Sequence, residues 1–288
     1  MNSEIQKIIS EYVLRVCGIV LGPEKAYLLE QRLNPLLPEF QCTNFEELAH
    51  LLSSFQGTLA SVRDKIIMAI TTNETSFFRD GSPWKMLAEV ILPYLAQLIS
   101  QRKARIPLRR GAKVRIWSAA SSTGQEPYSI AMSILEVLRM RQCPGVEADD
   151  FEILATDVSP RVLAKAIQGR YQQQDVARGL QNEMLSRYFV PMGENEYQAK
   201  EGIRRLVEFR NFNLTSDLSR LGAFDLIFCR NVLIYFSEEV KKTILRQMHA
   251  MLSAEGVLIL GSAENLYNLN DGFTSIHHQG SVYYRKRS

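Results

Sequence analysis

Residues 114–128 read VRIWSAASSTGQEPY, and the rest of the chain is arranged around this stretch. An apolar, β-prone run that ends at Trp117 passes into a loop of small residues. A helix then starts with Pro127 in its first turn, where the missing N–H does no harm. Small residues let a ligand approach the backbone, and a helix start offers free N–H groups. The order of strand, small-residue loop and helix therefore predicts a binding site for a nucleotide-like ligand.

The composition is that of an ordinary globular protein. Of the 288 residues, 46% are hydrophobic and 23% are charged, which fits one large domain or two smaller ones. The formal net charge of +3 indicates no strongly charged partner, so we expect no nucleic acid. No apolar run approaches the about 20 residues of a membrane span, and the N-terminal segment carries acids, unlike a secretory signal. We therefore expect a cytoplasmic protein without membrane insertion.

The cysteines suggest neither a metal site nor a disulfide framework. Cys17, Cys42, Cys143 and Cys229 are scattered, with no CxxC pair and no histidine at ligand spacing. This usage fits a reducing compartment. We expect no metal.

Residues 1–72 are predicted to form an all-helical domain. Apolar residues recur at helical spacing from Ile5 to Val16, and Asn44 with Glu47 three residues later marks a capped helix start. A last helix is expected from about Thr58 to Ile70. Six basic and eight acidic residues make the domain mildly acidic. A helical packing module and a partner-docking module both fit this pattern.

Residues 73–86 are expected to be a linker between this domain and a second one at 87–288. The stretch TTNETSFFRD (71–80) joins polar residues to two adjacent aromatics and Arg79. One interpretation is a capped helix start with both phenylalanines in the core. The other is a segment that lies over the ligand site and points Arg79 into it.

A basic run follows the first helix of the second domain. Seven basic residues and no acid lie between Arg102 and Arg115. Such runs can bind nucleic acid, but aromatic residues are not interleaved, and Pro107 and Gly111 indicate a loop. A solvated connection is the preferred interpretation.

The downstream pattern predicts an α/β fold with a mostly parallel, doubly wound sheet. The strand at 151–156 ends in Asp157, where such sheets commonly place an acid against ribose hydroxyls; a helix N-cap is the alternative role. Short β-type runs at about 183–208 indicate a small antiparallel insertion. The run 224–229, apolar except for Asp225, reads as a central parallel strand, and the tail as an edge hairpin turning at Gly280.

The loop chemistry favours S-adenosylmethionine over a dinucleotide. No glycine-rich phosphate loop is present, and Glu126 follows the small-residue loop. A carboxylate there repels phosphate but accepts from ribose hydroxyls and attracts a cation such as a sulfonium. The D/N-P-P-Y/F tetrad of amino-methylating enzymes is absent from the segment after residue 229. A carboxylate acceptor is already ionised and needs only orientation, which an arginine can supply.

Four ordered stretches resemble the chemoreceptor glutamate methyltransferases of the CheR type. They are TTNETSFFRD, RIWSAASSTGQEPYSIAM, ATDVSPRVLAKAIQGRY and FDLIFCRNVLIYF. The resemblance implies a helical N-terminal domain, a linker that lines the active site, and a class I S-adenosylmethionine-dependent methyltransferase domain with a small β insertion. It also implies methylation of glutamate side chains on the cytoplasmic helices of methyl-accepting chemoreceptors.

The resemblance also implies roles for individual residues. Cofactor contacts from the linker would come from Asn73, Thr75 and Arg79. The ribose or amino-acid ends would be held by Glu126 and Asp157, and the adenine and methionine sides lined by Asn213, Leu214, Arg230 and Asn231. The acceptor carboxylate would be placed by Arg79 and Tyr235.

Two departures from the family pattern matter. The usual pair of acids before the proline is Gln125-Glu126 here, so Glu126 alone inherits that role. The insertion PMGENEYQAKEG lacks the glycine-rich loop of members that dock a receptor's C-terminal pentapeptide, so we expect independence from that tether. A catalytically weak S-adenosylmethionine-binding sensor or scaffold is the alternative function.

Overall fold

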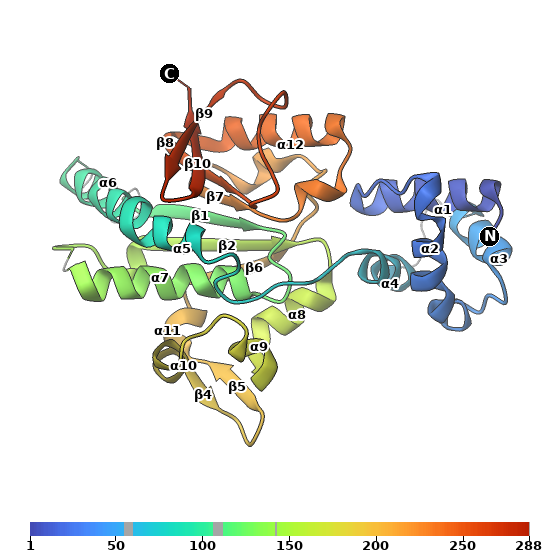
Figure 1. Ribbon diagram of the computed structural model, residues 1–288, viewed down its shortest axis with the longest axis horizontal. Helices are drawn as coiled ribbons and strands as arrows, with labels where there is room; N and C mark the ends of the chain where they lie inside the picture. Colours follow the sequence, from blue (N-terminus) through green and yellow to red (C-terminus); the bar gives the residue numbers. More distant parts are fainter. Residues whose placement is uncertain (55–59, 106–111, 142, 288) are drawn as a thin grey trace.

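The computed structural model describes residues 1–54, 60–105, 112–141 and 143–287. Figure 1 shows the N-terminal helices gathered at one side, and the strands with the remaining helices at the other. Within the described residues, no helix is both long and apolar enough to cross a bilayer.

The N-terminal part is helical, as predicted. Its described helices are α1 (Ser3–Cys17), α2 (Ala26–Leu33), α3 (Phe45–Ser54) and α4 (Ala60–Ile70), with short 3-10 turns η1 (Pro23–Lys25), η2 (Asn34–Leu36) and η3 (Pro38–Phe40). The predicted cap of α3 is present, because Asn44 Oδ1 accepts from the Glu47 N–H at 2.9 Å. The expected helix start near Thr58 lies outside the described residues. Apolar faces of the helices meet in one core around Ile9, Leu33 and Leu48.

A nearly continuous helical stretch follows the linker. It consists of α5 (Ser82–Met86), the π-helical segment η4 (Leu87–Ile91) and α6 (Leu92–Arg105). Four described members of the basic run have ion-pair partners. Arg102 forms a double ion pair with Asp225, Lys103 pairs with Asp150, and both Lys113 and Arg115 pair with Glu152. The loop expected at Pro107 and Gly111 lies outside the described residues.

The larger part of the chain contains a mostly parallel sheet, which confirms the predicted fold class. Its described strands are β1 (Val114–Ala119), β2 (Phe151–Asp157), β6 (Val207–Asn211), β7 (Phe224–Cys229), β8 (Leu252–Leu260), β9 (Phe273–His278) and β10 (Ser281–Lys286). The strand order is β6-β2-β1-β7-β8-β10-β9. The first five run parallel, and the terminal hairpin β9–β10 adds to β8 in antiparallel pairing, as expected.

Helices cover both faces of this sheet. Alternate residues of each strand point to opposite faces. Ile116 and Phe228 belong to the core that contains α6 and α7 (Gln125–Arg141), whereas Trp117 and Ile227 belong to the core that contains α12 (Glu238–Met251). Because the inner strands are buried on both faces, their sequences are mostly apolar and do not alternate.

The small antiparallel sheet is present, but its limits differ from the predicted 183–208. Its order is β3-β5-β4, formed by β3 (Arg170–Gln172), β5 (Glu196–Ala199) and β4 (Phe189–Pro191). The sheet starts earlier than expected because β3, at three residues, is too short to show alternation. It also ends earlier, since residues 207–208 belong to β6 of the main sheet.

The remaining helices connect these strands. They are α8 (Pro160–Gln168), α9 (Gln173–Ala177), α10 (Asn182–Tyr188) and α11 (Glu201–Arg204), with 3-10 turns η6 (Ala148–Asp150), η7 (Leu218–Leu221) and η8 (Leu233–Tyr235). Figure 1 shows α9, α10 and α11 beside the small sheet, which projects from the main body below α7 and α8.

Candidate active site

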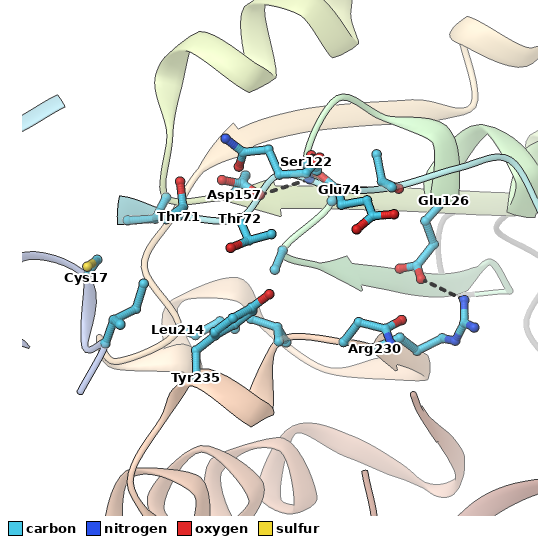
Figure 2. A pocket seen from close by; sticks show the side chains of 18 of the residues that line it. Cys17, Thr71, Thr72, Glu74, Ser122, Glu126, Asp157, Leu214, Arg230 and Tyr235 are labelled. Atoms are coloured by element: carbon cyan, nitrogen blue, oxygen red, sulfur yellow. Dashed lines mark hydrogen bonds and ion pairs between the residues drawn. The ribbon is translucent and has the colours of Figure 1, made fainter. Parts of the chain in front are cut away.

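A cavity lies at the carboxyl ends of β1, β2 and β7, under the linker and against the end of α1 (Figure 2). Its empty space is about 940 Å³, counting the part open to solvent. All ten residues singled out from the sequence line it: Asn73, Thr75, Arg79, Glu126, Asp157, Asn213, Leu214, Arg230, Asn231 and Tyr235.

The loop after β1 has an unusual backbone that brings it close to its neighbours. Ala120 and Ser122 have φ values of 58° and 50°, and Gly124 has φ 94°. A Cβ on Gly124 would lie 2.9 Å from the Ala166 side chain, closer than real contacts allow. The small residues of the loop are therefore required by geometry as well as by ligand approach.

Asp157 ties this loop to the loop after β2. Its two carboxylate oxygens accept from the backbone N–H groups of Ser122 and Ser159, both at 2.9 Å. Burial raises the pKa of Asp157, and the backbone donors oppose this shift. Asp157 is not the N-cap of α8: Ser159 occupies that position, without a capping hydrogen bond from its side chain. Carboxylate oxygens carry further lone pairs, so Asp157 retains the capacity to accept from a ligand in the cavity.

Glu126, in the first turn of α7, is the second buried carboxylate of the cavity. It accepts from Ser118 Oγ at 2.8 Å and pairs with Arg230 Nη1 at 3.3 Å (Figure 2). Burial raises the pKa of Glu126, and the Arg230 charge and the Ser118 hydrogen bond act in the opposite direction.

Arg230 lies directly after β7, and its side chain is only 1% exposed. Nη2 donates to the Arg79 carbonyl at 3.0 Å and to Asp80 Oδ2 at 2.8 Å. Arg230 therefore contacts the linker as well as Glu126. The role predicted for Arg230, lining the cofactor, did not include this contact with Asp80. Nothing in the sequence marks the two residues as close.

The backbone after Arg230 is held by Glu264. Asn231 has φ 58°, and Glu264 accepts from the N–H groups of Asn231, Val232 and Leu233 at 2.7–2.9 Å. Glu264 was missed from the sequence because it follows a different strand, β8, and no motif marks it.

The linker combines the features of both earlier interpretations. Phe77 is fully buried, and its ring meets Tyr171 edge-on at 5.0 Å. The polar side faces the cavity: Ser122 Oγ donates to the Asn73 carbonyl at 3.1 Å, and Arg79 Nη1 donates to the Glu74 carbonyl at 2.8 Å. The helix start itself does not lie here, since residues 72–76 form neither helix nor strand and helix α5 begins only at Ser82.

The helical domain contributes one wall of the cavity, through Cys17 and Ile19. Asn213 Nδ2 donates to the Val16 carbonyl at 3.1 Å, while its Oδ1 accepts from Thr215. The Asn213 side chain thus joins the two domains. Figure 2 shows Cys17 at the end of the cavity opposite Glu126 and Arg230. Sequence patterns gave no signal for this wall, because it depends on how the domains pack.

The matches to known families cover almost the whole chain. Residues 6–67 match "CheR methyltransferase, all-alpha domain", and residues 73–282 match "CheR methyltransferase, SAM binding domain". This chain belongs to the CheR methyltransferase family. The resemblance stated from the sequence is confirmed, and so is the expectation of a methyltransferase enzyme with an S-adenosylmethionine-binding domain.

Chemotaxis methyltransferases of the CheR family match this chain over nearly their whole length. The chain is 40% identical over 276 residues to chemotaxis protein methyltransferase 1 of Pseudomonas aeruginosa, covering 96% of this chain and 95% of the relative. It is 40% identical over 269 residues to chemotaxis protein methyltransferase 1 of Vibrio cholerae, covering 93% and 92%. A TehB-like SAM-dependent methyltransferase structure from Corynebacterium glutamicum is 16% identical, with TM-score 0.36, over 72% of this chain and 96% of that one, too weak a likeness for any conclusion.

The donor and acceptor groups of the CheR cavity fit S-adenosylmethionine. Among the described residues, the buried hydroxyls of Thr71 and Ser121 lack a hydrogen-bond partner, and both residues line the cavity. Buried polar groups are normally paired, so these hydroxyls fit a polar ligand. Leu214 and Ile19 provide apolar surface for a base, and Glu126 provides a negative charge at the other end. Within the described chain, no three His, Cys, Asp or Glu residues gather as metal ligands do.

Proposed function

We propose that this protein transfers the methyl group of S-adenosylmethionine to glutamate carboxylates on the cytoplasmic helices of chemoreceptors, and that it works in the cytoplasm. The names of its relatives, chemotaxis protein methyltransferases, support the pathway. The observation that carries the choice of acceptor is the position of Arg79 on the cavity wall, where its guanidinium can pair with a carboxylate.

The described lining residues include no histidine and no activated thiol that could serve as a base. Among the described lining residues, Cys17 is the only cysteine or histidine. Burial raises the pKa of the Cys17 thiol to about 11, so it is protonated and unreactive at neutral pH. A glutamate acceptor, with an ordinary pKa of about 4.3, requires no base.

When bound, S-adenosylmethionine supplies a methyl group on a positively charged sulfur. Glu126 would hold the positively charged end by charge attraction, and Asp157 would accept from the ribose hydroxyls. Asn73 and Thr75 of the linker would cover the ligand, and Asn213, Leu214, Arg230 and Asn231 would line its adenine and methionine sides. Arg79 would form paired hydrogen bonds with the acceptor carboxylate, and Tyr235 would flank it, which limits the reactants to a productive orientation.

We also propose that the enzyme does not use a receptor pentapeptide tether. Such a peptide would have to add to an edge of the small sheet. Met192, after β4, donates to the Glu196 carbonyl, so the alternating neighbour Pro191 faces the outer edge, where it has no N–H to offer. On the opposite edge, the N–H of Gln172 already donates to Asp175 at 3.1 Å. Both edges are therefore poor partners for an added strand.

A methyl-transfer assay tests the main proposal. The full chain is incubated with a chemoreceptor cytoplasmic fragment and S-adenosylmethionine labelled in its methyl group. We expect label on the fragment that base releases as methanol, as an ester requires. Binding of S-adenosylhomocysteine without any base-labile label would instead support the sensor or scaffold alternative. For the tether, calorimetry with an aromatic-containing pentapeptide should show no binding; a micromolar dissociation constant would contradict this part.

A further inference from the structure

We propose that Asp80 is a positioning residue, whose ion pair with Arg230 holds the linker turn that presents Arg79 to the cavity. This inference rests on the proposed function only for what Arg79 does to the acceptor. Asp80 itself is not among the described residues that line the cavity, so it must act through others.

The backbone around Arg79 adopts a conformation that needs support. Phe78 and Asp80 have φ values of 47° and 71°, and such left-handed values are uncommon for residues other than glycine. The turn is closed by the Ser82 N–H, which donates to the Asp80 carbonyl at 2.7 Å, and by the Phe78 N–H, which donates to Ser129 Oγ at 3.1 Å.

The carbonyl of Arg79 is held by two side-chain donors. It accepts from Trp84 Nε1 at 2.9 Å and from Arg230 Nη2 at 3.0 Å. The Arg79 side chain extends into the cavity wall and reaches the Glu74 carbonyl. These bonds fix the backbone position from which the Arg79 side chain reaches the cavity.

Asp80 completes the surroundings of the buried Arg230. The Arg230 side chain is 1% exposed and the Asp80 side chain 31% exposed, and they meet at 2.8 Å. Glu126 is the other carboxylate on Arg230, at the longer distance of 3.3 Å. A buried guanidinium needs its counter-charges to stay in place. Without the Asp80 charge, Arg230 loses its ion pair with the linker, and Glu126 becomes its stronger electrostatic partner.

The substitution Asp80→Asn tests this contact in the full chain. Asparagine tolerates positive φ as aspartate does, so the variant removes the charge and keeps the turn accessible. We expect kcat for receptor methylation to fall about tenfold or more, while the affinity for S-adenosylhomocysteine stays within about threefold. The matched control is Asp64→Asn, which removes a surface ion pair with Arg63 in the helical domain and should leave both unchanged.

Trypsin reports on the turn independently of methyl transfer, because it cuts after arginine. Because residue 80 follows the cut bond, each rate is divided by that for a short peptide with the same residues 74–84. We expect this normalised cleavage after Arg79 to be about tenfold faster in Asp80→Asn than in the wild type, with the Arg79→Ala chain identifying the cut by its absence. Unchanged cleavage would overturn the contact even if the wild-type enzyme methylated no receptor, so failure of this inference and failure of the proposed function remain distinct.

A double-mutant cycle separates positioning from general damage. If Asp80 acts through Arg79, adding Asp80→Asn to Arg79→Ala should lower kcat by less than about twofold further. If the double variant instead lost kcat by the product of the two single factors, Asp80 would act independently of Arg79, and the inference would be overturned.

Discussion

The surroundings of Glu126 disfavour the ionised form of its carboxyl group. Burial raises its pKa, and Arg230 and Ser118 offset only part of that shift. An acid with a raised pKa stays protonated at pH values above its ordinary range. The negative charge needed to attract a sulfonium therefore develops only as the pH rises past this higher pKa.

Binding of S-adenosylmethionine should consequently tighten as the pH rises from 5 and level off above the pKa of Glu126. Calorimetry across this range measures the effect. In Glu126→Gln the affinity should be about tenfold weaker at neutral pH and nearly independent of pH. S-adenosylhomocysteine, which has no charge on sulfur, is the matched ligand and should show a shallower dependence. A flat profile for the wild type would contradict this role of Glu126.

Arg79 is the second residue whose role can be isolated. Replacing it with alanine removes the paired hydrogen bonds proposed for the acceptor, so methyl transfer should fall by about tenfold or more, about 1.4 kcal/mol in the barrier. Initial rates with a receptor fragment measure this. Arg210→Ala, which removes an exposed ion pair with Glu208 on β6, is the control. Wild-type turnover in Arg79→Ala would remove Arg79 from the mechanism.

Strands β2 and β7 and the linker show how much of an element can be predicted from the sequence. The long apolar runs of β2 and β7 were placed within a residue of their observed limits, because period and burial are local properties. The polar and aromatic character of residues 71–80 also pointed to the site. What could not be predicted is pairing between distant residues, such as Arg230 with Asp80, or Asn213 with Val16, which depends on how finished elements pack.

The linker is also anchored by a close contact with Gly179, after α9. Gly179 has φ 111°, and a Cβ there would overlap the Phe77 carbonyl. Gly179→Ala should therefore displace the Phe77 segment and lower the free energy of unfolding by about 2 kcal/mol or more. Urea unfolding measures this. The control is Gly202→Ala in α11, where a Cβ would meet nothing within 4 Å, and equal stability of the two variants would disprove the contact.

At the scale of the whole molecule, the helical domain is part of the binding cavity. It supplies Cys17 and Ile19 to the wall, and Gly18 between them lies against the larger domain. Gly18 has φ 76°, and a Cβ there would overlap the Thr215 methyl and lie 3.0 Å from the Phe236 ring. The domains can approach this closely only because residue 18 has no side chain.

Gly18→Ala should therefore weaken S-adenosylhomocysteine binding about fivefold or more. Gly145→Ala is a close control, because Gly145 has φ 75° but open space around it, so it carries the same backbone strain without the contact. Calorimetry on both variants separates strain from packing. Equal affinities would show that the cavity tolerates a shift of the helical domain.

The bond from Asn213 to the Val16 carbonyl, together with the side-chain-free position at Gly18, has a consequence for how such enzymes diverge. The two halves of this protein cannot be exchanged freely between homologues by recombination. A hybrid that takes its first seventy or so residues from one parent needs positions 213, 215 and 236 from the same parent. Otherwise the two domains do not fit together at the wall of the cavity. Natural shuffling should therefore preserve these positions as a set.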